Sequence, residues 1–232
     1  MILARLLPFV ISMIAGATGA IGVLGLNGLL TAHITCNLVL LAGPIVAGLP
    51  VAVSYIPSVR DFMLILFLVG VIARTIEQRG GSSLPPLQLL QLLALIAFFV
   101  ISVTDGPWRN PDAGLAVTAG ISGVAAMAVQ NALAQVSLKN TATSAVMTTN
   151  VTQLMSDLSA VLIGGEAADV VKAKSCALQT LPVAIGFVIG CTLATAGEAA
   201  VGLSSLMLRT GLALLAFVVG IGHGTDIRHV RR

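Results

Sequence analysis

Residues 6–26 read LLPFVISMIAGATGAIGVLGL, an apolar run without a charged side chain. A bilayer core needs about 20 mainly apolar residues per helix, so this run is long enough to cross a membrane. Similar runs recur along the whole chain, whereas a cleaved signal peptide is one N-terminal segment. The chain is 57% hydrophobic and 9% charged, against about 25% charged residues in soluble domains. The sequence therefore predicts an all-α, polytopic transmembrane helix bundle, forming one integral membrane domain over residues 1–232.

Eight apolar segments are candidate spans: residues 6–26, 31–49, 58–76, 86–103, 113–136, 144–163, 178–196 and 201–222. Turn-forming pairs such as Asn27-Gly28 and Gly80-Gly81 separate them. The second and sixth segments each open with hydroxyl and amide residues, so either could be a broken or re-entrant helix. We therefore expect six to eight spans. The mixed charged run at 166–174 is expected to be a solvated loop.

Basic residues indicate the orientation, because cytoplasmic loops carry an excess of Lys and Arg. Eight spans with a cytoplasmic N-terminus place eight basic residues inside: Arg5, Arg60, Arg109, Lys172, Lys174, Arg228, Arg231 and Arg232. Three fall outside, namely Arg74, Arg79 and Lys139, and Arg209 lies within the last helix. This distribution predicts that both termini are cytoplasmic, and a different span count would change it.

An internal repeat relates the two halves of the chain. Residues 31–38, TAHITCNL, align with residues 144–151, SAVMTTNV, at an offset of 113 residues. The repeat halves would be about 1–110 and 111–225. Four spans per half would give parallel repeats, whereas re-entrant polar segments would leave three spans per half and invert the repeats. Both arrangements occur among transporters, and the repeat interface near the midplane is their usual binding site.

Polar residues inside a membrane are costly unless they are paired, so their clustering needs an explanation. The candidate polar lining consists of Thr31, His33, Thr35, Asn37, Gln130, Asn131, Thr148, Asn150 and Asp157. One interpretation is a path for a small solute, with His33 able to switch its charge near neutral pH. The other is hydrogen bonding between packed helices, which Ser, Thr, Asn and Gln commonly provide. An ion pair between Asp157 and Arg209 is a further possibility.

Glycines recur every third residue at Gly16, Gly19, Gly22 and Gly25. Small faces of this kind allow helices to approach closely. The segments at 6–26 and 113–136 correspond under the repeat, so we expect them to cross at its axis.

No enzyme motif is visible in the sequence: there is no Walker loop, GxSxG or HExxH pattern. The three cysteines are isolated and lack metal-ligand spacing. We therefore expect no catalysis, no metal and no cofactor. The net charge of +3 sits mostly at the ends of apolar runs, so nucleic-acid binding is not expected either.

The stretch 28–41, GLLTAHITCNLVLL, resembles the YoaK family of multispanning membrane proteins, classed as domain of unknown function 1275. The segments MAVQNA at 127–132 and TTNVTQL at 148–154 are similar to further family elements. Two positions depart from the family pattern, which usually has glycine where this chain has Cys36 and often an acidic residue where it has Gly19. The resemblance implies a membrane location and fold but assigns no activity.

The leading hypothesis for function is a transporter or channel for a small polar solute, with the lipid bilayer and that solute as its expected partners. The alternative is a noncatalytic membrane scaffold whose polar residues only hold helices together.

Overall fold

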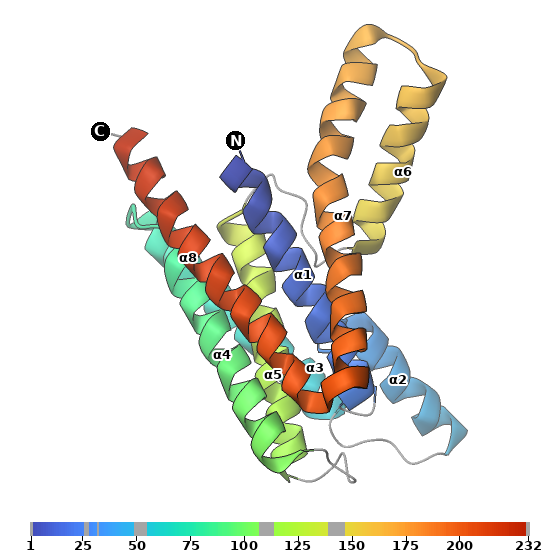
Figure 1. The fold of residues 1–232 in the computed structure, drawn as a ribbon, viewed down its shortest axis with the longest axis vertical. Coiled ribbons are helices and arrows are strands. Elements are labelled where there is room, and N and C mark those ends of the chain that lie inside the picture. Colours follow the sequence, from blue (N-terminus) through green and yellow to red (C-terminus); the bar gives the residue numbers. More distant parts are fainter. Residues whose placement is uncertain are drawn as a thin grey trace.

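Eight α-helices make up the bundle in the computed structural model, which describes residues 2–25, 28–31, 33–48, 55–106, 114–138 and 147–230 (Figure 1). In chain order they are α1 (Ile2–Gly25), α2 (Ile34–Ala47), α3 (Tyr55–Gln78), α4 (Leu84–Asp105), α5 (Gly114–Val136), α6 (Met147–Ile163), α7 (Ala167–Val201) and α8 (Leu206–Val230). A short 3₁₀ turn, η2 (Gly202–Ser205), joins α7 to α8. The expected all-helical class is confirmed.

Five of these helices, α1, α3, α4, α5 and α7, are long and apolar enough to cross a membrane. The helix α8 adds a shorter apolar stretch, Leu206–Ile221. By contrast, α2 has 14 residues, fewer than the roughly 17–25 that a span requires, and α6, with 17, is at the lower limit of that range. Large apolar side chains such as Phe67 and Met207 are each 66% exposed, which suits a lipid surrounding. The long apolar helices are compatible with a helical membrane protein, and the two polar-headed segments form the short helices.

The charged run at 166–174 is helical, so the prediction of a solvated loop there was wrong. The chain turns at Gly164 and Gly165, both with positive φ, and α7 then begins at Ala167. Asp169 lies in its first turn, where a carboxylate interacts favourably with the helix dipole. As a result α7 has 35 residues, and with α6 it forms a hairpin that projects beyond the rest of the bundle (Figure 1).

The helices of the two halves correspond one to one at the offset of 113 residues. Ile34, which begins α2, maps onto Met147, which begins α6. The packing corresponds too: α1 packs on α7 and α8, as α5 packs on α3 and α4. Likewise α2 packs on α3, as α6 packs on α7, while α4 and α8 pack on each other.

The two halves run in opposite directions. Ser12 and Gly16 of α1 bond to Val183 and Cys191 of α7, so α1 and α7 are parallel. Figure 1 shows α1 descending and α5 ascending, and the Gln130–Ile11 hydrogen bond joins the two. In the same way α4 descends and α8 ascends. Corresponding helices are therefore antiparallel, which is the inverted arrangement with short polar-headed helices.

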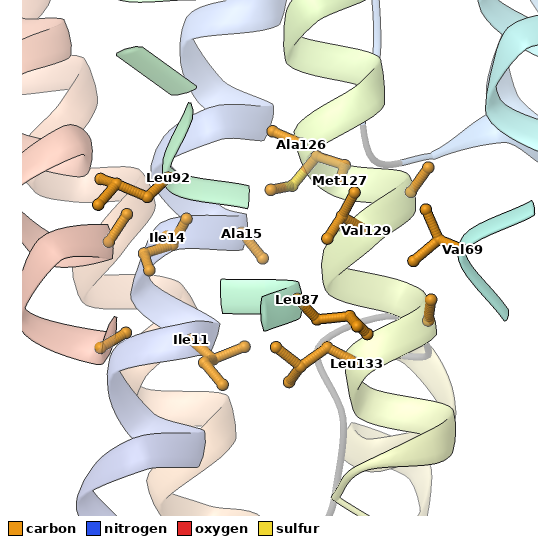
Figure 2. Close-up of a cluster of buried hydrophobic side chains, with 14 of the residues drawn as sticks. Ile11, Ile14, Ala15, Val69, Leu87, Leu92, Ala126, Met127, Val129 and Leu133 are labelled. Carbon is orange, nitrogen blue, oxygen red and sulfur yellow. The ribbon is translucent and has the colours of Figure 1, made fainter. Parts of the chain in front are cut away.

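The apolar core lies where α1, α3, α4 and α5 meet (Figure 2). Ile14 and Leu133 are fully buried there, and Leu87 and Val69 close it from α4 and α3. A second cluster, around Phe98, joins α4 to the ends of α1, α7 and α8. The bundle thus has a packed interior although its outer surface is apolar as well.

The closest helix packing is between α1 and α7. A Cβ atom at Gly190 would overlap the backbone of Met13, and one at Gly186 would overlap that of Phe9. These two glycines form a G-x-x-x-G pattern on α7, which allows backbones to approach. Gly16 of α1 meets the backbone at Phe187 from the other side. The glycine-rich face of α1 therefore packs mainly on α7, and its contact with α5 is smaller than the sequence suggested.

Candidate functional site

After α1, the chain turns back and runs along α1 toward the middle of the bundle. The backbone N–H of Gly28 donates to Val23 O, and Thr31 Oγ1 donates to Thr18 O at 3.3 Å. His33 then lies beside Phe187, with ring centroids 6.4 Å apart. Since Phe187 packs on Gly16, which is near the midpoint of the apolar segment Leu6–Gly25, α2 begins at half depth.

The start of α2 is held by Asn37, which is fully buried. Its side-chain amide donates to Leu30 O at 2.7 Å, and its Oδ1 accepts from the Leu30 N–H at 3.1 Å. A further contact of 3.4 Å joins Asn37 Nδ2 to Ser58 Oγ on α3. Asn37 therefore closes the loop between the returning segment and α2, which is a structural role.

The start of α6 has the same pattern of exposure. Asn150 is buried, as Asn37 is, whereas Thr148 and Thr35 are both exposed. In the hairpin of α6 and α7, Asn150 and the buried Thr180 are equally far along the chain from the turn at Gly165, so we take them to lie at about the same level. Because Val183 bonds to Ser12 one turn further along α7, α6 also begins near the middle of the bundle.

Two half-length helices therefore start beside the middle of α7 and leave in opposite directions, α6 upward and α2 downward (Figure 1). The N-terminal end of a helix carries unpaired N–H groups and a partial positive charge. His33, at the N-cap of α2, makes no side-chain capping bond to those groups. With the exposed hydroxyls of Thr35 and Thr148, this is a place where an otherwise apolar surface offers donors and acceptors.

Asp157 does not pair with Arg209. Its Oδ1 accepts a hydrogen bond from Gln153 Nε2 at 2.9 Å, one turn earlier on α6. Within the described residues the one ion pair is Arg60–Asp61, and Arg209 lies on α8, which is not packed on α6. The sequence alone does not show which helices pack together, so it could not exclude this pair.

Gln130 belongs to a separate network in the core. Its Nε2 donates to Ile11 O at 3.0 Å, and its Oε1 accepts from Gln91 Nε2 at 2.6 Å. Asn131, next to it, is half-buried. The nine predicted lining residues therefore fall into three groups: those at the start of α2, those on α6, and the pair on α5.

Polar residues on α4 and α8 were absent from the predicted lining. Gln88 donates from Nε2 to Ala216 O at 2.9 Å, which links α4 to α8. Gln88 and Gln91 stand three residues apart in a leucine-rich run, so their spacing on one helix face was a usable signal. Arg209 is fully buried and lies over the Phe98 ring. Among the described residues no group of three or more His, Cys, Asp or Glu could hold a metal ion.

Comparison with known proteins identifies a family and nothing closer. The family model described as "Protein of unknown function (DUF1275)" matches residues 7–222. No curated protein and no solved structure matches the chain. Since the match covers almost the whole chain, this protein belongs to the DUF1275 family, and the suspected resemblance is confirmed.

Proposed function

We propose that this DUF1275 protein crosses the membrane several times and moves a small polar or weakly charged solute through the bilayer, without catalysing a reaction. Its partners in this proposal are the lipid bilayer and the solute, and nucleic acid is not among them. The candidate path runs past the starts of α2 and α6, where Thr35 and Thr148 expose hydroxyl groups.

The observation that carries the proposal is the pair of half-length helices that begin beside the middle of α7. Inverted repeats with broken or half-length helices are typical of transporters, and their helix ends at the midplane bind polar solutes. Irregular backbone at that depth is tolerated where it is buried in protein or lines a watery cavity. A chain that needed only to fill the membrane would have no use for two such breaks.

The orientation follows from six spans, with α2 and α6 returning to the side they came from. Nine of the 12 basic residues then lie on the side of the termini: Arg5, Arg74, Arg79, Lys139, Lys172, Lys174, Arg228, Arg231 and Arg232. Arg60 and Arg109 lie on the other side, and Arg209 lies within α8. This excess is larger than the eight-span count gave, and it supports cytoplasmic termini.

A scaffold is the second candidate, and the hydrogen bonds of Asn37 and Gln130 favour it. Both side chains are occupied by backbone partners, Leu30 and Ile11, and therefore hold the fold together. Hydrogen bonds of this kind are common between membrane helices. The hydroxyls that remain available to a solute are those of Thr35 and Thr148. Removing them therefore distinguishes a transporter from a scaffold.

The experiment compares solute flux in proteoliposomes by stopped-flow light scattering, with urea, glycerol and propionic acid as probes. The Thr35→Val/Thr148→Val variant removes both hydroxyls and keeps the side-chain shape. The matched control is Thr192→Val, an exposed threonine whose hydroxyl bonds to Val188 O in its own helix. We expect the double variant to lose about tenfold in flux, equivalent to ~1.4 kcal/mol, with an unchanged melting temperature.

Two outcomes would contradict the proposal, the first its transport function and the second its path. If no probe crosses faster than in empty liposomes, the transport function is wrong and the scaffold function is the better account. If flux is present but equal in the parent, the double variant and the control, the path lies elsewhere.

A further inference from the structure

A buried arginine without a hydrogen-bond partner lies between α4 and α8. Arg209 has no solvent exposure, and its guanidinium carbon is 3.8 Å from the centroid of the Phe98 ring. Its Nε, Nη1 and Nη2 atoms make no hydrogen bond within the described part of the chain. A buried charge of this kind is costly unless an anion or several acceptors meet it.

The acidic side chain at this corner, Glu198, is already bonded to another group. It forms no ion pair with Arg209 in the described structure. The Glu198 Oε2 atom instead accepts a hydrogen bond from Ser205 Oγ at 3.0 Å. The positive charge of Arg209 therefore lacks a direct counter-ion among the described side chains.

A cavity of about 290 Å³ opens one helical turn away, where α4 ends against the turn between α7 and α8. Its lining comprises Ser102, Val103, Gly106, Glu198, Val201, Gly202 and Ser204. Ser102 lies one turn beyond Phe98 on α4, and its buried hydroxyl has no partner in the described structure. Arg209 is not among the lining residues, but Ser205, one turn before it on the chain, adjoins the lining residue Ser204. Helical side chains lean toward the N-terminus, which for Arg209 is the Ser205 end.

From this arrangement we propose that the corner between α4, α7 and α8 binds a small monocarboxylate, with Ser102 as the donor to its carboxylate and the buried charge of Arg209 beside the cavity as the attraction. A positive charge in a low-dielectric interior acts on an anion across several ångströms, so the guanidinium favours a negatively charged ligand without touching it. One arginine neutralises one negative charge, and Glu198 at the mouth disfavours a second. The walls from Val103 and Val201 suit a short alkyl tail, and the cavity is at the lower limit of ligand pockets in size.

This binding site is separate from the helix ends at α2 and α6, and it does not depend on transport. The residues that line the cavity belong to the C-terminal end of α4 and the turn between α7 and α8, and these segments lie at the end of the bundle opposite the two chain termini (Figure 1). A ligand could therefore bind there whether or not any solute crosses the membrane.

The test is thermal unfolding of the purified full-length protein in an uncharged detergent, titrated with sodium propionate against sodium chloride of equal ionic strength. We expect a saturable rise in melting temperature with propionate alone. Arg209→Gln should abolish it, while Arg60→Gln, which removes an exposed arginine, should keep it. Ser102→Ala should weaken the apparent affinity about tenfold, as the loss of one hydrogen bond to a charged group does.

Three results would overturn the proposal. The first is a propionate response that is no larger than that of chloride, or that persists in Arg209→Gln. The second is a response to inorganic phosphate or phosphatidylglycerol micelles with none to propionate, which would assign the arginine to a phosphate group. The third is a Glu198→Gln variant with a lower melting temperature and no tighter propionate binding, which would make Glu198 the counter-ion. If Arg209→Gln does not fold, the propionate affinity of Ser102→Ala is the test instead, and an unchanged affinity would overturn the proposal.

Discussion

Replacing Gly190 by alanine tests the closest helix contact in the bundle. A Cβ atom there would lie 2.8 Å from the backbone carbon atoms of Met13, whereas ordinary contacts are 3.4–4 Å. The backbones of α1 and α7 would have to separate by several tenths of an ångström. Overpacking of this kind costs about 1–3 kcal/mol.

The matched control is Gly211→Ala on α8, where an added Cβ meets no atom within 4 Å. Both variants gain the same helix propensity, about 1 kcal/mol, so this gain cancels in the comparison. At roughly 2–4 °C per kcal/mol for a chain of this size, Gly190→Ala should melt about 2–12 °C below Gly211→Ala. Melting is followed by circular dichroism in detergent. Equal melting temperatures would refute the backbone contact between α1 and α7.

Three further predictions concern buried polar side chains, each tested by thermal unfolding. Gln130→Leu should cost about 1–3 kcal/mol, because it leaves the Gln91 amide without its acceptor. Adding Gln91→Leu should cost less than the sum of the single variants, and strict additivity would contradict the bond. Asn37→Leu should also cost about 1–3 kcal/mol, since both polar groups of Leu30 lose their partner; an unchanged melting temperature would contradict this role. Without added anion, Arg209→Met should melt at or above the parent, because it removes an unpaired buried charge; a large loss would show that the charge is satisfied.

The sequence predicted the membrane helices well because each long apolar run has few alternatives. The segments at 58–76, 86–103 and 113–136 begin and end within three residues of α3, α4 and α5. Apolar periodicity and length decide such helices locally. The start of α7 was missed because its first turns carry Asp169 and Lys172, and the prediction gave charge more weight than the glycine turn before them.

Repeat orientation could not be decided from the sequence. Whether the repeats are parallel or inverted depends on whether the segments at 31–49 and 144–163 cross the membrane. The decisive fact is that Thr31 lies against Thr18, which is a contact between α1 and the chain that follows it. Contacts of that kind have no signature in composition.

The structure divides the predicted polar lining into side chains bonded within the fold and side chains that are exposed. Asn37 and Thr35 are two residues apart, and one is buried against Leu30 while the other is exposed. For Arg209 the sequence suggested an ion pair with Asp157 of α6. In the structure Arg209 of α8 lies over Phe98 of α4. Tertiary packing decides which polar side chain is occupied by the fold and which is available to a ligand.

The central claim is that α2 is a half-length helix that returns to the side from which it came. It is tested most directly by labelling single cysteines with a membrane-impermeant maleimide, in a background where Cys36, Cys176 and Cys191 are alanine. Leu24→Cys and Val46→Cys are the two probes, at exposed positions near the ends of α1 and α2. We predict that both react from the same side of the membrane. Reaction from opposite sides would mean that α2 crosses the bilayer, and it would contradict the inverted repeat.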